Sequence, residues 1–214
     1  MRFSSTFVAF FAAFATAMPT AEPADDPKAA FPPPGTVSIR DIKLSGSGCP
    51  QGTVATLLSD DGQTVTFGFD KYIASTGPGI SAVEARKNCQ VFFNLFYPQG
   101  YSYTLATTDY RGYIDQEQSC TTTLSTTNFF SGDQSQMTSA VSVTGALDAN
   151  YLRTSKVATE TLVWAKCGAK GPTFVTNSQV SVKCKDKKQA AVAGVDSQVT
   201  KFQIKYFLSW KRCT

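Results

Sequence analysis

The alternation of apolar and polar residues predicts β-strands along most of the chain. Residues 64–69 alternate with a period of two, and residues 59–63 before them contain Asp-Gly, a pair typical of a tight hairpin turn. Residues 37–44 begin with the same alternation and then change phase, which predicts a bulge within the strand. Residues 199–208 place aromatic and aliphatic side chains on one side and polar ones on the other, which is typical of a half-buried antiparallel strand.

Further apolar runs complete the predicted fold. Residues 89–97 are apolar on both faces, which predicts a central strand covered on both sides. We expect additional strands at residues 101–106, 120–129, 139–147, 161–166 and 173–183, and a single helical turn near residues 80–87. About nine or ten strands with short turns predict an all-β fold, an antiparallel β-sandwich, with a distorted barrel as the second interpretation.

The start of the chain differs in composition from the rest. Residues 1–17 contain Arg2, a run of about eight apolar residues and Ala-Thr-Ala, the pattern of a cleaved signal peptide. The run is far shorter than the roughly 20 residues of a membrane-spanning helix, so we expect a secreted, extracellular protein without a membrane span. Residues 18–35 hold six of the ten prolines and predict a linker or pro-segment. Residues 36–214 then form a single domain.

Six cysteines follow the predicted signal peptide. An even number in a secreted chain predicts three disulfides, although six cysteines allow fifteen pairings. The pairs we expect are Cys49–Cys89, Cys120–Cys213 and Cys167–Cys184, the last because residues 168–172 have the composition of a turn between two strands. No Cys-x-x-Cys motif is present, which argues against a redox enzyme or a zinc site.

The chain contains no histidine, and of all its features this absence most restricts the catalytic and metal-binding chemistry open to it. It excludes Ser-His-Asp and Cys-His catalysis and histidine-based zinc sites, so we expect no metal and no cofactor. The formal net charge is +4 with 17% charged residues, a bias too mild to predict nucleic-acid binding. The local cluster at residues 183–188 holds four lysines, which either form a solvated loop or contact anionic polysaccharide or lipid headgroups weakly.

Two groups of side chains are candidates for function. Asp115 and Glu117 share a face of an extended segment and leave carboxylate-based glycoside hydrolysis open. The second group is a cluster of tyrosines with an acidic and a basic partner. Its members either line the core of the sandwich or form an exposed platform that suits sugar rings and protein partners. They are Tyr97, Tyr101, Tyr103, Asp109, Tyr110, Arg111 and Tyr113.

Four local motifs resemble the DUF4360 family of small secreted proteins, found in fungi and some bacteria. They are residues 48–54 (GCPQGTV), 85–90 (ARKNCQ), 97–101 (YPQGY) and 109–113 (DYRGY). The resemblance spans roughly residues 37–213. It implies a secreted, cysteine-bridged β-domain of the kind found among candidate fungal effectors, and it supplies no catalytic residues to transfer to this chain.

Three functional hypotheses follow from the sequence. The first is a non-catalytic, disulfide-stabilised binding protein, effector-like, which acts on a host or cell-wall component through carbohydrate or a host protein. The second is a structural protein of the cell wall or surface. The third is a carboxylate-dependent carbohydrate-active enzyme, which would need two carboxylates in one cleft, about 5–10 Å apart. An exposed tyrosine patch without such a pair would favour the first hypothesis.

Overall fold

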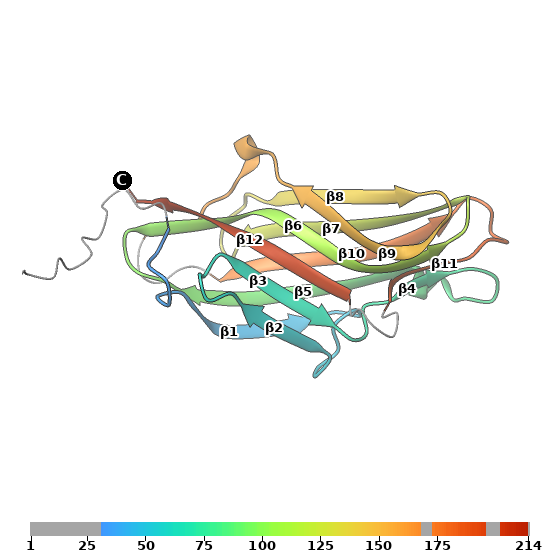
Figure 1. The fold of residues 1–214 in the computed structure, drawn as a ribbon, viewed down its shortest axis with the longest axis horizontal. Coiled ribbons are helices and arrows are strands. Elements are labelled where there is room, and N and C mark those ends of the chain that lie inside the picture. Colours follow the sequence, from blue (N-terminus) through green and yellow to red (C-terminus); the bar gives the residue numbers. More distant parts are fainter. Residues whose placement is uncertain (1–30, 168–172, 196–201, 214) are drawn as a thin grey trace, which may run out of the picture.

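Two antiparallel sheets pack face to face in this protein (Figure 1). The structure is a computed structural model that describes residues 31–167, 173–195 and 202–213. The first sheet has five strands in the order β1-β5-β10-β7-β8. Their bounds are Ser38–Ser45 for β1, Arg86–Phe96 for β5, Phe174–Cys184 for β10, Cys120–Phe130 for β7 and Met137–Thr144 for β8.

The second sheet has seven strands. Six follow the order β2-β3-β12-β6-β11-β4, and β9 pairs with β6. Two short 3₁₀-helices, η1 (Ala82–Ala85) and η2 (Thr159–Thr161), lie between strands. The strand bounds are Val54–Leu58 for β2, Thr64–Phe69 for β3, Phe202–Arg212 for β12, Tyr101–Gln116 for β6, Ala191–Val195 for β11, Ala74–Thr76 for β4 and Leu147–Lys156 for β9.

The predicted β-sandwich is confirmed, and several local features agree with the sequence pattern. The phase change in residues 37–44 is a bulge in β1, where the pairing with β5 shifts between Ile39 and Asp41. The Asp-Gly turn joins β2 and β3 as an antiparallel hairpin, with the Gly62 N–H donating to the Ser59 carbonyl at 2.9 Å. The helical turn expected near residues 80–87 is η1.

Other strand predictions were wrong. Residues 161–166 form no strand; after η2 this segment instead packs along β6, where the Ala165 N–H donates to the Tyr103 carbonyl. The prediction also placed no strand at Leu147–Lys156, which is β9. The strand β5 is not covered on both sides, because Phe92 is half-buried and Phe96 is 43% exposed on its outer face.

The core lies between the two sheets and is filled by aromatic rings. Alternate side chains of β12 point inward, so that Phe202, Ile204, Tyr206, Leu208 and Trp210 are buried. Tyr206 packs against Phe67 of the neighbouring β3, and Phe67 contacts Phe93 of β5 in the opposite sheet, as expected for two inner faces that interdigitate. This is why the period-two pattern of β12 predicted its burial correctly.

The structure contains three disulfides, of which one pair matches the expected pairing. Cys49 is bonded to Cys89 as predicted. Cys120 is bonded to Cys184, and not to Cys213, because β7 and β10 are neighbours and place these two residues directly opposite each other.

The remaining pair is Cys167–Cys213, and the expected Cys167–Cys184 bond is absent. The segment before Cys167 contacts one edge of β6, where the Ser102 hydroxyl donates to the Ala165 carbonyl at 2.6 Å. The Cys213 N–H donates to the Gly100 carbonyl at 2.8 Å, just before β6 begins. The disulfide therefore closes around the start of β6.

Some sequence predictions fall outside the described residues. These are the signal peptide at residues 1–17, most of the proline-rich segment at residues 18–35 and the turn at residues 168–172. Within the described part of the chain, no helix has the length and apolar character needed to cross a membrane.

Candidate functional site

Four of the five tyrosines in the predicted cluster are buried between the sheets. Tyr97, Tyr101, Tyr103 and Tyr110 are at most 4% exposed. Tyr103 packs against Tyr97 and Trp210, with ring centroids 5.4 and 5.5 Å apart. The sequence left open whether the tyrosines line the core or form an exposed platform, and these four line the core.

A bulge in β6 explains why Tyr103 and Tyr110 both point inward. They are seven residues apart, so a regular strand would place them on opposite faces. The pairing of β12 with β6 skips Ala106, which adds one residue to β6 and reverses the alternation beyond it. The Tyr110 hydroxyl then shares a hydrogen bond with Thr126 of the opposite sheet, and burial raises the pKa of Tyr110.

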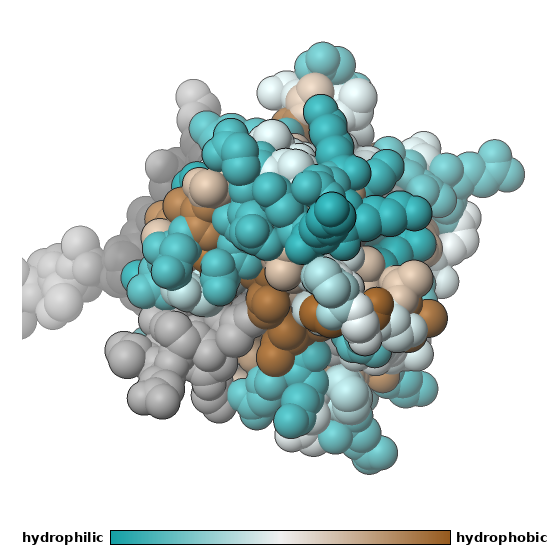
Figure 2. Space-filling model, turned by 90° about the vertical axis from the view of Figure 1, so that its right-hand side faces the viewer, coloured by the Kyte–Doolittle hydropathy of each residue, from teal (hydrophilic) through white to brown (hydrophobic). Residues whose placement is uncertain are grey.

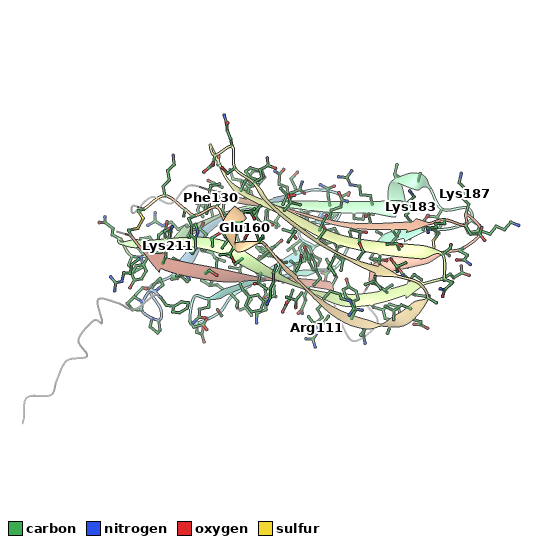
Figure 3. The ribbon with its side chains drawn as sticks, turned by 90° about the horizontal axis from the view of Figure 1, so that it is seen from above. Arg111, Phe130, Glu160, Lys183, Lys187 and Lys211 are labelled. Carbon is green, nitrogen blue, oxygen red and sulfur yellow. A yellow bond between two sulfur atoms is a disulfide. The ribbon has the colours of Figure 1, made fainter. Side chains whose placement is uncertain are left out.

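The same bulge brings the other three predicted residues, Asp109, Arg111 and Tyr113, to the outer face of the seven-stranded sheet. They alternate along β6, and the Arg111 side chain points away from the sheets in Figure 3. The Tyr113 hydroxyl donates to the Asp148 carboxylate of β9. This hydrogen bond and the nearby negative charges raise the pKa of Tyr113.

A groove on this outer face collects side chains from three neighbouring strands. Its volume is about 240 Å³. We call it the β6 groove, and the residues that line it are Asp109, Arg111, Leu152, Gln203 and Lys205. Asp109 and Arg111 come from β6, Leu152 from β9, and Gln203 and Lys205 from β12.

The register of the sheet fixes the positions of these side chains. Lys205 stands opposite Asp109 and Gln203 opposite Arg111 across the β12–β6 pairing. The Thr154 hydroxyl donates to Asp109 at 2.6 Å and orients the carboxylate. Because paired strands fix the backbone more firmly than loops do, the groove presents two cations, one carboxylate and one amide from defined backbone positions.

Leu152 adds an apolar surface to this polar arrangement. It is 57% exposed and lies opposite Arg111 across the β9–β6 pairing. A groove with an apolar side chain beside convergent hydrogen-bonding groups is typical of a site that orients a small ligand or part of a larger one.

A second hollow, of about 230 Å³, lies on the outer face of the five-stranded sheet. Asp41, Lys43, Phe92 and Asn94 are among its lining residues, and Asp41 is the one carboxylate. Among the described residues, no group of three Cys, Asp or Glu side chains is close enough to hold a metal ion. Asp115 and Glu117, the pair considered for catalysis, are exposed, and neither belongs to either hollow.

Sequence reasoning missed Leu152, Gln203 and Lys205. The alternation in β12 did place Gln203 and Lys205 on a solvent-facing side, but it carried no signal for which strand lies beside them. Leu152 belongs to β9, a strand that the pattern did not predict. Pairing between distant segments, and not local pattern, assembles this site.

Comparison with known proteins places the chain in a family. The family model described as a domain of unknown function, DUF4360, matches residues 35–213. The chain belongs to the DUF4360 family. A relative in Arthroderma benhamiae, named an uncharacterized secreted protein, is 37% identical over 183 residues, covering 86% of this chain and 74% of the relative. The expected extracellular location of this DUF4360 protein is confirmed by that relative and agrees with the three disulfides.

Solved structures resemble this DUF4360 domain only distantly. TmCBM61 in complex with β-1,4-galactotriose has a TM-score of 0.24 at 9% identity, over 80% of this chain and 88% of that one. A family 11 carbohydrate-binding module from Clostridium thermocellum, in complex with a mixed-linked tetrasaccharide, has a TM-score of 0.22 at 6% identity, over 83% of this chain and 92% of that one. TM-scores this low say nothing about the ligand of this chain.

Proposed function

We propose that this protein is a secreted, non-catalytic binding protein that holds a carbohydrate of a host or cell-wall component in the β6 groove. The observation that carries the proposal is the convergence of Arg111, Lys205, Asp109 and Gln203 beside an exposed leucine. Sugar hydroxyls both donate and accept hydrogen bonds, and this set offers charged donors, a charged acceptor and an amide that does both.

The positions of the donors and acceptors support binding by a preformed site. The groove residues stand on paired strands, and Asp109 is held by Thr154, so little backbone entropy is lost when a ligand binds. Leu152 offers the apolar contact that the C–H face of a sugar ring requires. The groove contributes one carboxylate, Asp109, whereas two-carboxylate hydrolysis uses a pair that flanks the bond to be broken.

A glycan array followed by titration of the best ligand tests this proposal. We expect the wild-type protein to bind a subset of cell-wall glycans, and Arg111→Ala to weaken binding by roughly 10- to 150-fold, the range for losing a hydrogen bond to a charged group. Arg40→Ala is a matched control, because Arg40 is an exposed arginine stacked on Phe96 of the other sheet. The Arg40→Ala variant should bind the glycan with the affinity of the wild type.

Two outcomes would contradict the proposal. If the protein binds no glycan on the array, carbohydrate is not its ligand. If Arg111→Ala and Arg40→Ala lose the same amount of glycan affinity, the β6 groove is not the binding site. Recovery of the bound glycan at its original length distinguishes binding from hydrolysis. A shortened glycan with new reducing ends would favour a carbohydrate-active enzyme instead.

A further inference from the structure

One end of the sandwich combines an apolar hollow with a cluster of lysines. The hollow has a volume of about 360 Å³ and opens between the β4–η1 loop and the β10–β11 loop. Ile80, Ala82, Ala85 and Val182 supply apolar walls. Lys183 and Lys187 line it as well, and both lie at this end in Figure 3. We call this region the lysine end.

Apolar side chains project into solvent at the lysine end. Val83 is 73% exposed and Ile80 is 40% exposed. Figure 2, which faces this end, shows apolar side chains gathered near its middle with polar groups around them. Ile80 lines the hollow, and Val83 stands in η1 next to Ala82, which lines it too. Exposed aliphatic side chains grouped around an apolar hollow mark an interaction surface more often than isolated exposed residues do.

Hydrogen bonds hold the two loops in place. In the β4–η1 loop the Ile80 N–H donates to the Gly77 carbonyl at 3.1 Å, and in the β10–β11 loop the Gln189 N–H donates to the Asp186 carbonyl at 3.1 Å. A Cβ atom on Gly77 would lie 3.0 Å from the Cβ of Ala190, so the loops also touch each other. The apolar side chains are therefore displayed by a defined structure.

The charge of this end is positive. Lys183, Lys185, Lys187 and Lys188 are exposed, and among the described residues none of them has a carboxylate within ion-pair distance. The nearby carboxylates instead accept hydrogen bonds from other groups of the protein. These are Glu84 with the Lys87 ammonium at 2.7 Å, Asp186 with the Lys188 N–H at 2.9 Å, and Glu117 with the Ala190 N–H at 2.5 Å.

We propose that the lysine end docks on the surface of an anionic phospholipid bilayer. Val83 and Ile80 enter the boundary between headgroups and acyl chains, and the lysines around them contact the negatively charged headgroups. Charge alone would also suit an acidic polysaccharide, but such a polymer leaves the exposed aliphatic side chains without a role. This surface is separate from the β6 groove, which lies on the outer face of the seven-stranded sheet.

Co-sedimentation of the full-length secreted protein with vesicles tests the proposal. We expect binding to vesicles of equal parts phosphatidylcholine and phosphatidylserine, and none to phosphatidylcholine alone. A lysine near an anionic surface contributes about 1 kcal/mol, or roughly 5-fold in partitioning, so Lys183→Gln with Lys187→Gln should lose roughly 30-fold. The matched control is Lys43→Gln with Lys156→Gln, two exposed lysines on strands of the sheets.

A third variant separates lipid docking from simple charge attraction. Val83→Ser keeps every charge but removes apolar surface, and it should lose roughly tenfold if the Val83 side chain enters the bilayer. Unchanged partitioning of Val83→Ser, equal losses in the two lysine variants, or no binding to the anionic vesicles would each overturn the proposal. Loss of vesicle binding in Val83→Ser with unchanged glycan binding would support it, and it would leave the function of the β6 groove to its own test.

Discussion

Raising the pH above the ordinary pKa of tyrosine should unfold this protein cooperatively. Seven tyrosine side chains in the core are at most 5% exposed, and for five of them burial raises the pKa far above its usual value near 10. For Tyr206 the pKa rises to about 12. The five are Tyr72, Tyr103, Tyr110, Tyr151 and Tyr206.

The sign and size of the effect follow from proton linkage. Above pH 10 the unfolded chain loses these protons while the folded protein keeps them, so the free energy of unfolding falls as pH rises toward the folded pKa values. At about pH 11 each tyrosine costs about 1.4 kcal/mol, or about 7 kcal/mol for the five. This is comparable with the whole stability of a typical domain, roughly 5–15 kcal/mol, and below pH 10 the full contribution is retained.

Parallel measurements of tyrosinate absorbance and far-ultraviolet circular dichroism across the alkaline range would check this prediction. We expect the buried tyrosines to ionise together with the loss of β-structure, in one transition above pH 10. Tyr113→Phe is the comparison at the surface. The pKa of Tyr113 is raised chiefly by its hydrogen bond to Asp148, so its removal should shift the transition far less than the five core tyrosines do together. Full ionisation near pH 10 with an intact sheet spectrum would refute the burial on which the reasoning rests.

Two further predictions concern stability. Gly48→Ala should lower the free energy of unfolding by about 1–3 kcal/mol in urea denaturation, because its Cβ would lie 2.1 Å from a ring carbon of Tyr72. Gly68→Ala, whose Cβ would meet no atom within 4 Å, should change it by less than about 0.5 kcal/mol; equal losses would contradict the packing of Tyr72. Replacing both Cys167 and Cys213 by Ser opens a loop of 46 residues and should cost about 4 kcal/mol. An unchanged urea midpoint would argue against this pairing.

The sequence predicted those elements whose signal is local. The alternation of β3 and β12 was sufficient because each strand has one face in the core and one in solvent. The strand β9 gave no such signal, because few of its side chains are fully buried. Its existence depends on the edge of β6, which is more than thirty residues earlier in the chain.

The cysteine pairing shows the same limit. Cys120 and Cys184 are 64 residues apart, and they meet because β7 and β10 are neighbours in the five-stranded sheet. No property of the residues around either cysteine specifies that strand order. The expectation that Cys167 would pair with Cys184 relied on proximity in the chain, which is a weak guide in a sandwich whose neighbouring strands come from distant segments.

The bulge at Ala106 connects the core to the β6 groove. Without this extra residue, the alternation of β6 would carry Tyr110 to the solvent and turn Asp109 and Arg111 toward the core, where unpaired charges are costly. With it, one strand supplies buried rings on both sides of the bulge and charged side chains to the outer face. The tyrosine cluster predicted from the sequence therefore divides into two parts. Its buried tyrosines belong to the core, and Asp109 and Arg111 form the polar part of the β6 groove. The lysine end is built from loops at the margin of the same sandwich, so the two proposed surfaces can be altered independently.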